Sequence, residues 1–228
     1  MNPEFDEYAH EYSDLLRDPI RDGFVTDPRF FHQRKWMLIR NFFARHKTDL
    51  TRLQWLDVGC GRGELLELAG SHFDRAVGCD PSVRMMETCR TNEVYEQPSP
   101  VELPFPNSSF DFVTAVCVYH HVHGKARDDL TRAVHRVLRP GGIFCMIEHN
   151  PWNPATRLIV KRCPVDADAE LLTARSARRL VRSEPFSILE TDYFLYLPQK
   201  IFRYASAVEG ALHKLPFGGQ FAVFCCKS

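Results

Sequence analysis

An excess of charge of either sign is missing from this sequence. Its 228 residues include 29 lysines and arginines and 29 aspartates and glutamates, so the formal net charge at pH 7 is zero. Proteins that bind nucleic acid usually carry a surplus of basic side chains. We therefore expect no nucleic-acid substrate, although a local basic patch would be compatible with this balance.

Long apolar runs are also missing. No stretch is long enough to cross a bilayer, and the acidic beginning at residues 1–6 lacks the basic start and apolar run of a secretory signal. The sequence therefore predicts a cytoplasmic protein without membrane insertion. Its length suits one α/β domain with an added cap.

Closely spaced cysteines are absent too. The chain has eight cysteines but no CxxC pair, and Cys225 and Cys226 are adjacent. Structural zinc sites use short, regular spacings. The cysteines are better explained as small buried side chains, and no metal is expected.

What the sequence does contain is a glycine-rich turn between an apolar strand and a helix. The segment Trp55–Gly63 reads WLDVGCGRG, and Asp80 ends a second apolar stretch at residues 76–79. Glycine allows positive φ and a close approach of a ligand to the main chain. An acid at the end of the second strand can accept hydrogen bonds from a ribose diol. The pattern predicts an adenosine-containing cofactor across the carboxyl ends of parallel strands.

Asp57 narrows the choice of cofactor. Dinucleotide-binding folds use GxGxxG to seat an anionic pyrophosphate at a helix N-terminus, whereas this turn is GxGxG and is preceded by a carboxylate. The carboxylate would repel a pyrophosphate and attract an ammonium group. A nucleotide-binding oxidoreductase is therefore the less favoured alternative.

Together with three later segments, this turn resembles the motifs of class I S-adenosylmethionine-dependent methyltransferases, in particular the type 11 group. The later segments are Leu103–Asp111 (LPFPNSSFD), Val118–Val122 (VYHHV) and Val137–Gly142 (VLRPGG), and the four motifs cover roughly residues 50–150. The resemblance implies that S-adenosylmethionine is the cofactor. It also implies that a methyl group is transferred to an acceptor, leaving S-adenosylhomocysteine.

Alternating apolar strands and amphipathic helices predict an α/β fold with a Rossmann-like, doubly wound sheet of seven mostly parallel strands. Strands are expected near residues 53–58, 75–79, 93–95, 111–117, 142–148, 188–195 and 220–226. The resemblance implies that the last strand is antiparallel. Helices are expected near residues 30–45, 63–70, 82–91, 125–138 and 173–182.

Segments outside this common pattern are expected to cover the site. Residues 1–47 are predicted to form an N-terminal helical lid, with coverage of one sheet face as the alternative. Residues 48–228 are expected to form the methyltransferase domain, with substrate-cap insertions near 150–174 and 198–219.

The resemblance assigns cofactor roles to residues at the ends of the first strands. Asp57 would hold the ammonium of the methionine moiety, and Asp80 would accept both ribose hydroxyls. The alternative for Asp80 is an N-cap of the helix that begins at Pro81. The full expected set is Asp57, Gly59, Cys60, Gly61, Gly63, Asp80, Pro81, Met85, Ser99, Pro100, Val101 and the backbone carbonyl of Cys117.

Adenine recognition departs from the family pattern. Just before the LPF segment the family usually places an Asp or Asn that binds the adenine amino group. Here Ser99 lies near that position, with Gln97 and Glu102 as nearby alternatives. Met85 could pack on the adenine face or belong to the core.

Polar clusters follow the fourth and fifth strands, where the methyl group should emerge. Methylation of a hydroxyl releases a proton that a histidine could accept. The candidate catalytic residues are His120, His121, Glu148 and His149, and helix-start or pocket-wall roles stay open for the histidines. The candidate substrate contacts are Tyr8, Tyr12, Asn150, Trp152 and Arg157.

The sequence therefore predicts an S-adenosylmethionine-dependent methyltransferase that acts on a small molecule, such as a lipid-, sugar-, quinone- or natural-product-like acceptor. A monomer or a homodimer is expected. Two alternatives remain: a non-catalytic regulatory protein that binds S-adenosylmethionine, and a methyltransferase acting on a protein or RNA.

Overall fold

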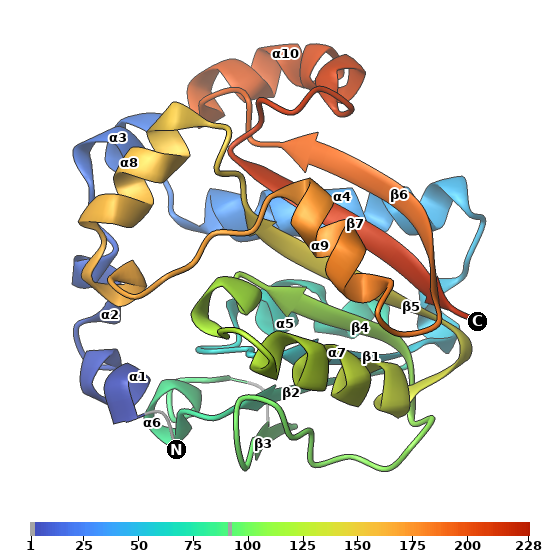
Figure 1. The fold of residues 1–228 in the computed structure, drawn as a ribbon. Helices are drawn as coiled ribbons and strands as arrows, with labels where there is room; N and C mark the ends of the chain where they lie inside the picture. Colours follow the sequence, from blue (N-terminus) through green and yellow to red (C-terminus); the bar gives the residue numbers. More distant parts are fainter. Residues whose placement is uncertain (1–2, 91–92) are drawn as a thin grey trace.

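A seven-stranded sheet with the order β3-β2-β1-β4-β5-β7-β6 organises the chain in the computed structural model, which describes residues 3–90 and 93–228 (Figure 1). Strands β1 to β5 run parallel, whereas β7 pairs antiparallel with both β5 and β6. The predicted doubly wound sheet and its antiparallel last strand are confirmed. The strands are β1 (Gln54–Val58), β2 (Arg75–Asp80), β3 (Val94–Glu96), β4 (Phe110–Val116), β5 (Leu138–His149), β6 (Phe186–Phe194) and β7 (Gln220–Lys227).

Helices cover both faces of the sheet and bury its continuous apolar strands, as expected for parallel strands. On one face lie α7 (Ala126–Val137) and α9 (Ala174–Val181) (Figure 1). On the other lie α4 (Arg29–Arg45) and α5 (Glu64–Ala69). Ile39, Phe42 and Phe43 recur at helical spacing on α4, and the Phe42 ring stacks on Phe224 of β7 at 4.0 Å between centroids. The helix predicted over residues 30–45 is confirmed.

Short helices gather at the carboxyl ends of the parallel strands. They are α1 (Pro3–Tyr8), α2 (Tyr12–Leu15), α3 (Pro19–Phe24), α8 (Pro154–Arg162) and the 3₁₀ turn η4 (Pro164–Asp166). Asp18 caps α3 by accepting the backbone N–H of Ile20, and its second oxygen lies 3.5 Å from Arg162 of α8. The segment before β1 and the segment after β5 therefore contact each other at the carboxyl ends of the parallel strands (Figure 1).

Helix α10 (Gln199–Leu212) is held to α4 by a buried ion pair. Arg34 of α4 bonds to Glu209 of α10, and its guanidinium lies 3.6 Å from the centre of the Phe202 ring. Both charged side chains are almost fully buried. This pair fixes α10 above the sheet (Figure 1).

The helix predicted near residues 82–91 is much shorter than expected. Only Val83–Met86 form α6, which begins where the Ser82 hydroxyl accepts the Met85 N–H. The Thr88 hydroxyl then donates to the Met85 carbonyl at 3.0 Å, and a turn follows. The Cys89 N–H bonds to the carbonyl of Met86, only three residues earlier, so the chain leaves the α-helical pattern. Within the described residues 82–90 the prediction was wrong in length, and residue 91 lies outside them. Helices α8 and α10, which fall in the two expected insertions, were not predicted.

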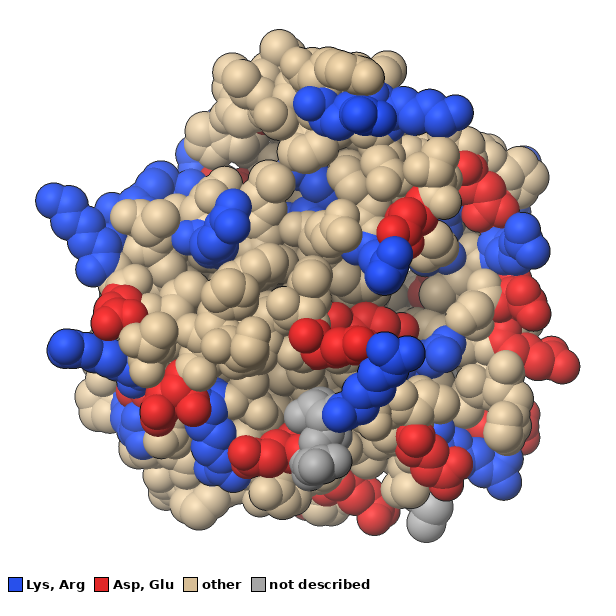
Figure 2. Space-filling view, turned by 180° about the vertical axis from the view of Figure 1, so that it is seen from behind, with Lys and Arg blue, Asp and Glu red and all other residues tan. Residues whose placement is uncertain are grey.

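The remaining short elements are the 3₁₀ turns η1 (Leu50–Arg52), η2 (Gly70–His72) and η3 (Tyr119–His121). None of the helices in the described part of the chain combines the length and apolar composition needed to cross a membrane. On the face turned away from Figure 1, basic and acidic side chains are interspersed among uncharged ones (Figure 2). That face does not present an extended surface of one charge.

Candidate functional site

The glycine turn after β1 is shaped by positive φ and by tight packing. Gly59 has a φ of +65°, and a Cβ atom there would lie 2.5 Å from a methyl carbon of Val118. Its N–H and that of Cys60 donate to the Cys79 carbonyl of β2. A side chain at Gly59 would therefore both strain the backbone and clash, which explains the glycine that the sequence places there.

Two buried carboxylates flank this turn. Asp80 accepts the Gly61 N–H at 2.7 Å and the Ser82 N–H at 2.8 Å, while Asp57 accepts the Thr114 hydroxyl at 2.6 Å. Burial raises the pKa of Asp57 to about 7 and that of Asp80 to about 6, against these hydrogen bonds. A buried carboxylate without a cation favours its neutral form, so both groups are suited to a ligand that brings positive charge or hydroxyl donors. The N-cap of α6 is Ser82 rather than Asp80.

Lys35 of α4 lies across the cavity from the turn. It is 7% exposed, and the described residues offer its ammonium no hydrogen bond or ion pair. Its charge lowers the pKa of Asp57, which places the two groups in one electrostatic environment. A buried, unpaired ammonium beside a carboxylate is suited to a zwitterionic ligand, whose carboxylate and ammonium would pair with Lys35 and Asp57.

The expected adenine end is lined by Gln97 and not by Ser99. The Gln97 amide donates to the Ser99 carbonyl at 2.8 Å, and its oxygen accepts from the Cys79 thiol. Gln97, Pro100 and Met85 line the cavity, whereas the Ser99 hydroxyl is buried away from it without a partner in the described part of the chain. Of these two predicted residues, only Gln97 therefore faces the cavity.

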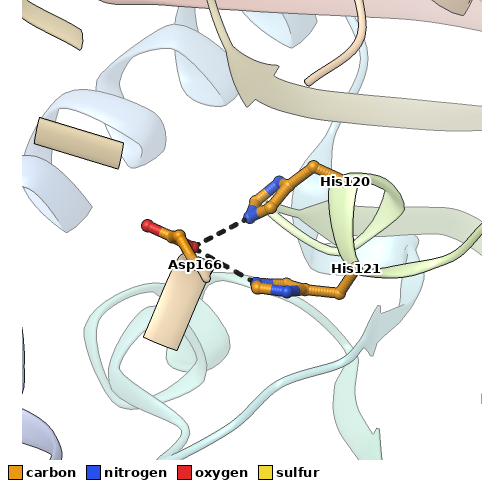
Figure 3. Close-up of side chains that lie close together, drawn as sticks. All are labelled: His120, His121 and Asp166. Atoms are coloured by element: carbon orange, nitrogen blue, oxygen red, sulfur yellow. Dashed lines mark ion pairs between the residues drawn. The ribbon is translucent and has the colours of Figure 1, made fainter. Parts of the chain in front are cut away.

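Histidines and carboxylates meet at the other end of the cavity. His120 Nδ1 lies 2.6 Å from Glu148 Oε2, and Glu148 Oε1 also accepts the backbone N–H of Tyr119 at 2.8 Å. On the cavity side, Asp166 Oδ1 lies 3.4 Å from His120 Nε2 and 3.5 Å from His121 Nε2 (Figure 3). Glu148 thus sits behind His120, while Asp166 faces both imidazoles from the segment after β5.

Burial and neighbouring charges separate the pKa values in this cluster. Burial opposes protonation of His120, but Glu148 and Asp166 outweigh it and raise the pKa of His120 to about 10. Burial lowers the pKa of His121 and that of His149 to about 4, and the charge on His120 acts in the same direction. The cluster therefore combines one cationic imidazole with two neutral ones at neutral pH.

One cavity of about 1080 Å³ joins these two ends. It is bounded by the glycine turn, the strand ends, α2 to α4 and α8. Cys117, the residue after β4, has a φ of +58°. This left-handed conformation turns the chain sharply between the glycine-turn end and the histidine end of the cavity. The predicted residues that line the cavity are Tyr12, Asp57, Gly59, Cys60, Gly61, Asp80, Pro81, Met85, Pro100, Cys117, His120, His121 and His149.

Several predicted site residues lie elsewhere. Trp152 is 68% exposed, Arg157 is exposed, and the buried Asn150 amide donates to the backbone carbonyls of Pro216 and Gly218. Asn153, three residues further on, does line the cavity. The residues outside the cavity wall are Tyr8, Gly63, Ser99, Val101, Glu148, Asn150, Trp152 and Arg157.

Several cavity residues were not predicted from the sequence, and three of them are polar residues that matter for the site: Lys35, Asp166 and Gln220. Lys35 could have been noticed because a charge interrupts the apolar face of the helix at residues 30–45. Asp166 and Gln220 carry no such signal, since their approach to the site depends on how the segment after β5 and the last strand fold back. The Gln220 amide donates to the Cys117 sulfur at 3.3 Å, and its buried oxygen has no partner among the described residues.

Comparison with known proteins agrees with this geometry. Residues 56–146 match the family model described as a methyltransferase domain. The chain is 31% identical over 102 residues to an uncharacterized methyltransferase of Synechocystis sp., covering 43% of this chain and 48% of that protein. It is 35% identical over 99 residues to the 27-O-demethylrifamycin SV methyltransferase of Amycolatopsis mediterranei, covering 38% of this chain and 35% of that protein. The chain thus spans about half or less of the length of these relatives.

Other similarities extend over more of the chain at lower identity. A sterol 24-C-methyltransferase of Schizosaccharomyces pombe is 24% identical over 211 residues, covering 81% of this chain and 54% of that protein. A probable tRNA methyltransferase of Bos taurus is 26% identical over 167 residues, covering 64% and 36%. A crystal structure from Thermotoga maritima, described as a possible histamine N-methyltransferase, covers all of both chains with a TM-score of 0.68 at 18% identity. At this identity the structural match shows the fold alone.

Proposed function

We propose that this chain, whose residues 56–146 match a methyltransferase domain, transfers the methyl group of S-adenosylmethionine to a small amphiphilic acceptor. The observation that carries the proposal is the single cavity that contains both the Asp57–Asp80 end and the His120–His121 end. One end would hold the cofactor and the other the acceptor, so that the methyl group lies between them.

The cofactor would be bound through all of its polar parts. Asp57 would pair with the ammonium of the methionine moiety and Lys35 with its carboxylate, because both are buried and face the cavity. Asp80 would accept the ribose hydroxyls, and Gln97 would hydrogen-bond the adenine edge. Each of these side chains belongs to a different element, so the folded sheet assembles the site.

Methyl transfer from a sulfonium needs alignment more than activation. The leaving thioether is neutral, so the site mainly holds nucleophile, methyl carbon and sulfur in line and excludes water. A hydroxyl acceptor would lose one proton, and His149, which lines the cavity and has no hydrogen bond to its ring among the described residues, would accept it. Glu148 would act as a positioning residue, because both of its oxygens hold the turn that carries His120.

The lining of the acceptor end favours an amphiphilic molecule. Apolar side chains from four separate segments share the cavity wall with cationic ones. Such a wall can bury an apolar body while leaving a polar group near solvent. The apolar residues are Ile20, Phe24, Phe31, Ile159 and Leu195, and the cations are Arg17 and Arg21.

Residues 1–47 would close over the bound cofactor as a lid. The Ser82 hydroxyl donates to Asp6 at 2.6 Å, and Arg62 of the glycine turn donates to the Ser13 hydroxyl at 2.8 Å. The Phe5 ring contacts His121 edge-on at 5.0 Å between centroids. The first helices therefore touch both ends of the cavity. The segment near 150–174 would complete the cap, since it supplies Asn153, Ile159 and Asp166 to the wall, whereas the segment near 198–219 supplies Gly219 alone.

An RNA acceptor is less well supported, although tRNA methyltransferases occur among the similar proteins. Binding to RNA depends on a surface that can neutralise many phosphates. The net charge is zero, and the face in Figure 2 mixes both signs. A small acceptor fits a cavity of about 1080 Å³ better.

The first test is calorimetric titration with S-adenosylhomocysteine, with NAD as the control. We expect micromolar binding of S-adenosylhomocysteine alone. Methyl-labelled S-adenosylmethionine would then be incubated with the protein and a cell extract, and label in organic-extractable material would be compared with label in acid-precipitable material. Label in the acid-precipitable fraction would mean that the acceptor is a protein or RNA and not a small molecule. Binding of S-adenosylhomocysteine without any methyl transfer would favour a regulatory protein.

A further inference from the structure

The cluster of His120, His121 and Asp166 has the form of a metal site. Its three ligand atoms lie within 4.8 Å of one another and line the cavity (Figure 3). We propose that these three residues bind one divalent transition-metal ion of the zinc class, with a free coordination position for an acceptor oxygen. The site joins the turn after β4 to the 3₁₀ turn η4.

The distances suit tetrahedral coordination. Ligands about 2.0–2.1 Å from a tetrahedral ion are about 3.3–3.5 Å apart. Asp166 Oδ1 lies 3.4 Å from His120 Nε2 and 3.5 Å from His121 Nε2. The third separation, between the two imidazole nitrogens, is within 4.8 Å, so rotation of the imidazole side chains would complete the coordination of an ion.

The residues behind the ligands orient them for a metal. An ionised carboxylate only accepts hydrogen bonds, so His120 Nδ1 must carry the proton in its 2.6 Å contact with Glu148. In the cationic imidazole Nε2 also carries a proton and faces Asp166 Oδ1; a bound ion would take the place of this proton, and the Nε2 lone pair would then point to the metal. Carboxylate–histidine pairs of this kind fix metal-binding imidazoles in known sites. Glu148 is itself fixed by the backbone N–H groups of Val118 and Tyr119.

The donor set selects the class of ion and leaves room for a substrate. Two imidazoles and one carboxylate suit zinc and neighbouring transition metals, whereas magnesium and calcium prefer oxygen ligands alone. Three protein ligands with an open fourth position are typical of catalytic rather than structural sites. The two carboxylates, Asp166 and Glu148, would balance the charge of a divalent ion.

The role of the ion rests on the proposed function and narrows its acceptor to a hydroxyl compound. A bound divalent ion lowers the pKa of a coordinated hydroxyl. The acceptor proton would pass to His149 and from there to solvent, the oxygen would form its bond to the methyl carbon, and the carbon–sulfur bond would break. The products are a methyl ether and neutral S-adenosylhomocysteine.

The test is metal binding by the untagged full chain, first stripped with a chelator. Cobalt(II) would be titrated because tetrahedral cobalt absorbs visibly, and bound zinc would be measured by mass spectrometry after dialysis. We expect one equivalent of either ion, no stoichiometric magnesium, and a loss of affinity of at least tenfold in His121→Ala and Asp166→Asn. Glu148→Gln should weaken binding by about 10–100-fold.

The matched control is His123→Ala. His123 lies 3.4 Å from Glu170 in a neighbouring exposed histidine–carboxylate pair that does not line the cavity, so this variant should bind cobalt as the wild type does. Equal affinity in His121→Ala and wild type, or no stoichiometric binding by the wild type, would overturn the site. Binding of S-adenosylhomocysteine, measured on the same samples, reports folding and tests the methyltransferase proposal separately.

Discussion

Asp80 Oδ2 accepts the backbone N–H of Gly61 at 2.7 Å, so the carboxylate expected to bind ribose also fixes the glycine turn. Its other oxygen accepts the Ser82 N–H at 2.8 Å. The two functions are compatible because each carboxylate oxygen has two lone pairs. The residue proposed to contact the ligand therefore also sets the shape of the glycine turn.

Replacement of Asp80 should reveal both functions. We expect Asp80→Ala to weaken S-adenosylhomocysteine binding at least tenfold, because hydrogen bonds to a charged acceptor contribute about 1.5–3 kcal/mol each. Asp80→Asn retains an acceptor for one backbone N–H and should lose less. Calorimetry on both variants measures this, and unchanged affinity in Asp80→Ala would show that the ribose is held elsewhere.

Cofactor affinity should fall as the pH is lowered. The pKa of Asp57 is raised to about 7 and that of Asp80 to about 6 by burial, so both become neutral between pH 8 and pH 5.5. Since the ammonium of the cofactor needs ionised Asp57, we expect at least about a tenfold loss of affinity over this range. Asp57→Asn should bind more weakly at pH 8 and show a flatter profile.

The unliganded protein should show the opposite trend in stability. A carboxyl group whose pKa is higher in the folded than in the unfolded state binds extra protons on folding, here between about pH 4 and pH 7. Relative to Asp57→Asn, the wild type should therefore gain thermal stability as the pH falls from 8 to 5. A parallel pH dependence of the two melting curves would contradict the buried environment assigned to Asp57.

Lys35→Met should weaken binding of ligands that carry the methionine carboxylate. The expected loss for S-adenosylhomocysteine is about tenfold, because the carboxylate would lose its charged donor. The control ligand is 5′-methylthioadenosine, which has the adenosine but lacks the amino-acid end, and its affinity should not fall. An equal loss for both ligands would place Lys35 in a structural role.

Gln97 and Ser99 offer a paired test of adenine recognition. Gln97→Leu should weaken 5′-methylthioadenosine binding by about fivefold or more, since one hydrogen bond contributes about 1 kcal/mol. Ser99→Ala should leave the affinity unchanged and the melting temperature equal or higher, because the buried hydroxyl has no partner in the described part of the chain. The reverse pattern would restore Ser99 as the adenine contact.

The sequence predicts the central sheet well because its signals are local. Apolar runs such as Phe221–Cys225 and the glycine turn at residues 59–63 mark the strands and their ends through neighbouring residues. The cavity walls are harder to predict. A charge on the apolar face of its helix marks Lys35 as unusual, but its approach to the site and that of Asp166 depend on how α4 and η4 pack against the sheet, which no local pattern encodes. Trp152 and Arg157 were assigned to substrate from proximity in sequence, but the hydrogen bonds of Asn150 turn that loop outward.

The buried ion pair between Arg34 and Glu209 should matter for stability and not for cofactor chemistry. Arg34→Met would leave the Glu209 carboxylate buried without its cation. We expect this to lower the free energy of unfolding by about 3–5 kcal/mol. The melting temperature should then fall by about 6 °C or more. Glu209 also accepts the backbone N–H groups of Leu195 and Leu197, so Arg34→Met/Glu209→Gln should recover part of the loss by removing the charge while keeping an acceptor.

The control is Arg90→Met, which breaks the exposed pair with Glu67 and should cost less than about 1 kcal/mol. A difference of 1 kcal/mol corresponds to about 2–4 °C in melting temperature for a chain of this size. If the melting temperatures of Arg34→Met and Arg90→Met differ by less than about 2 °C, the Arg34–Glu209 pair does not anchor α10.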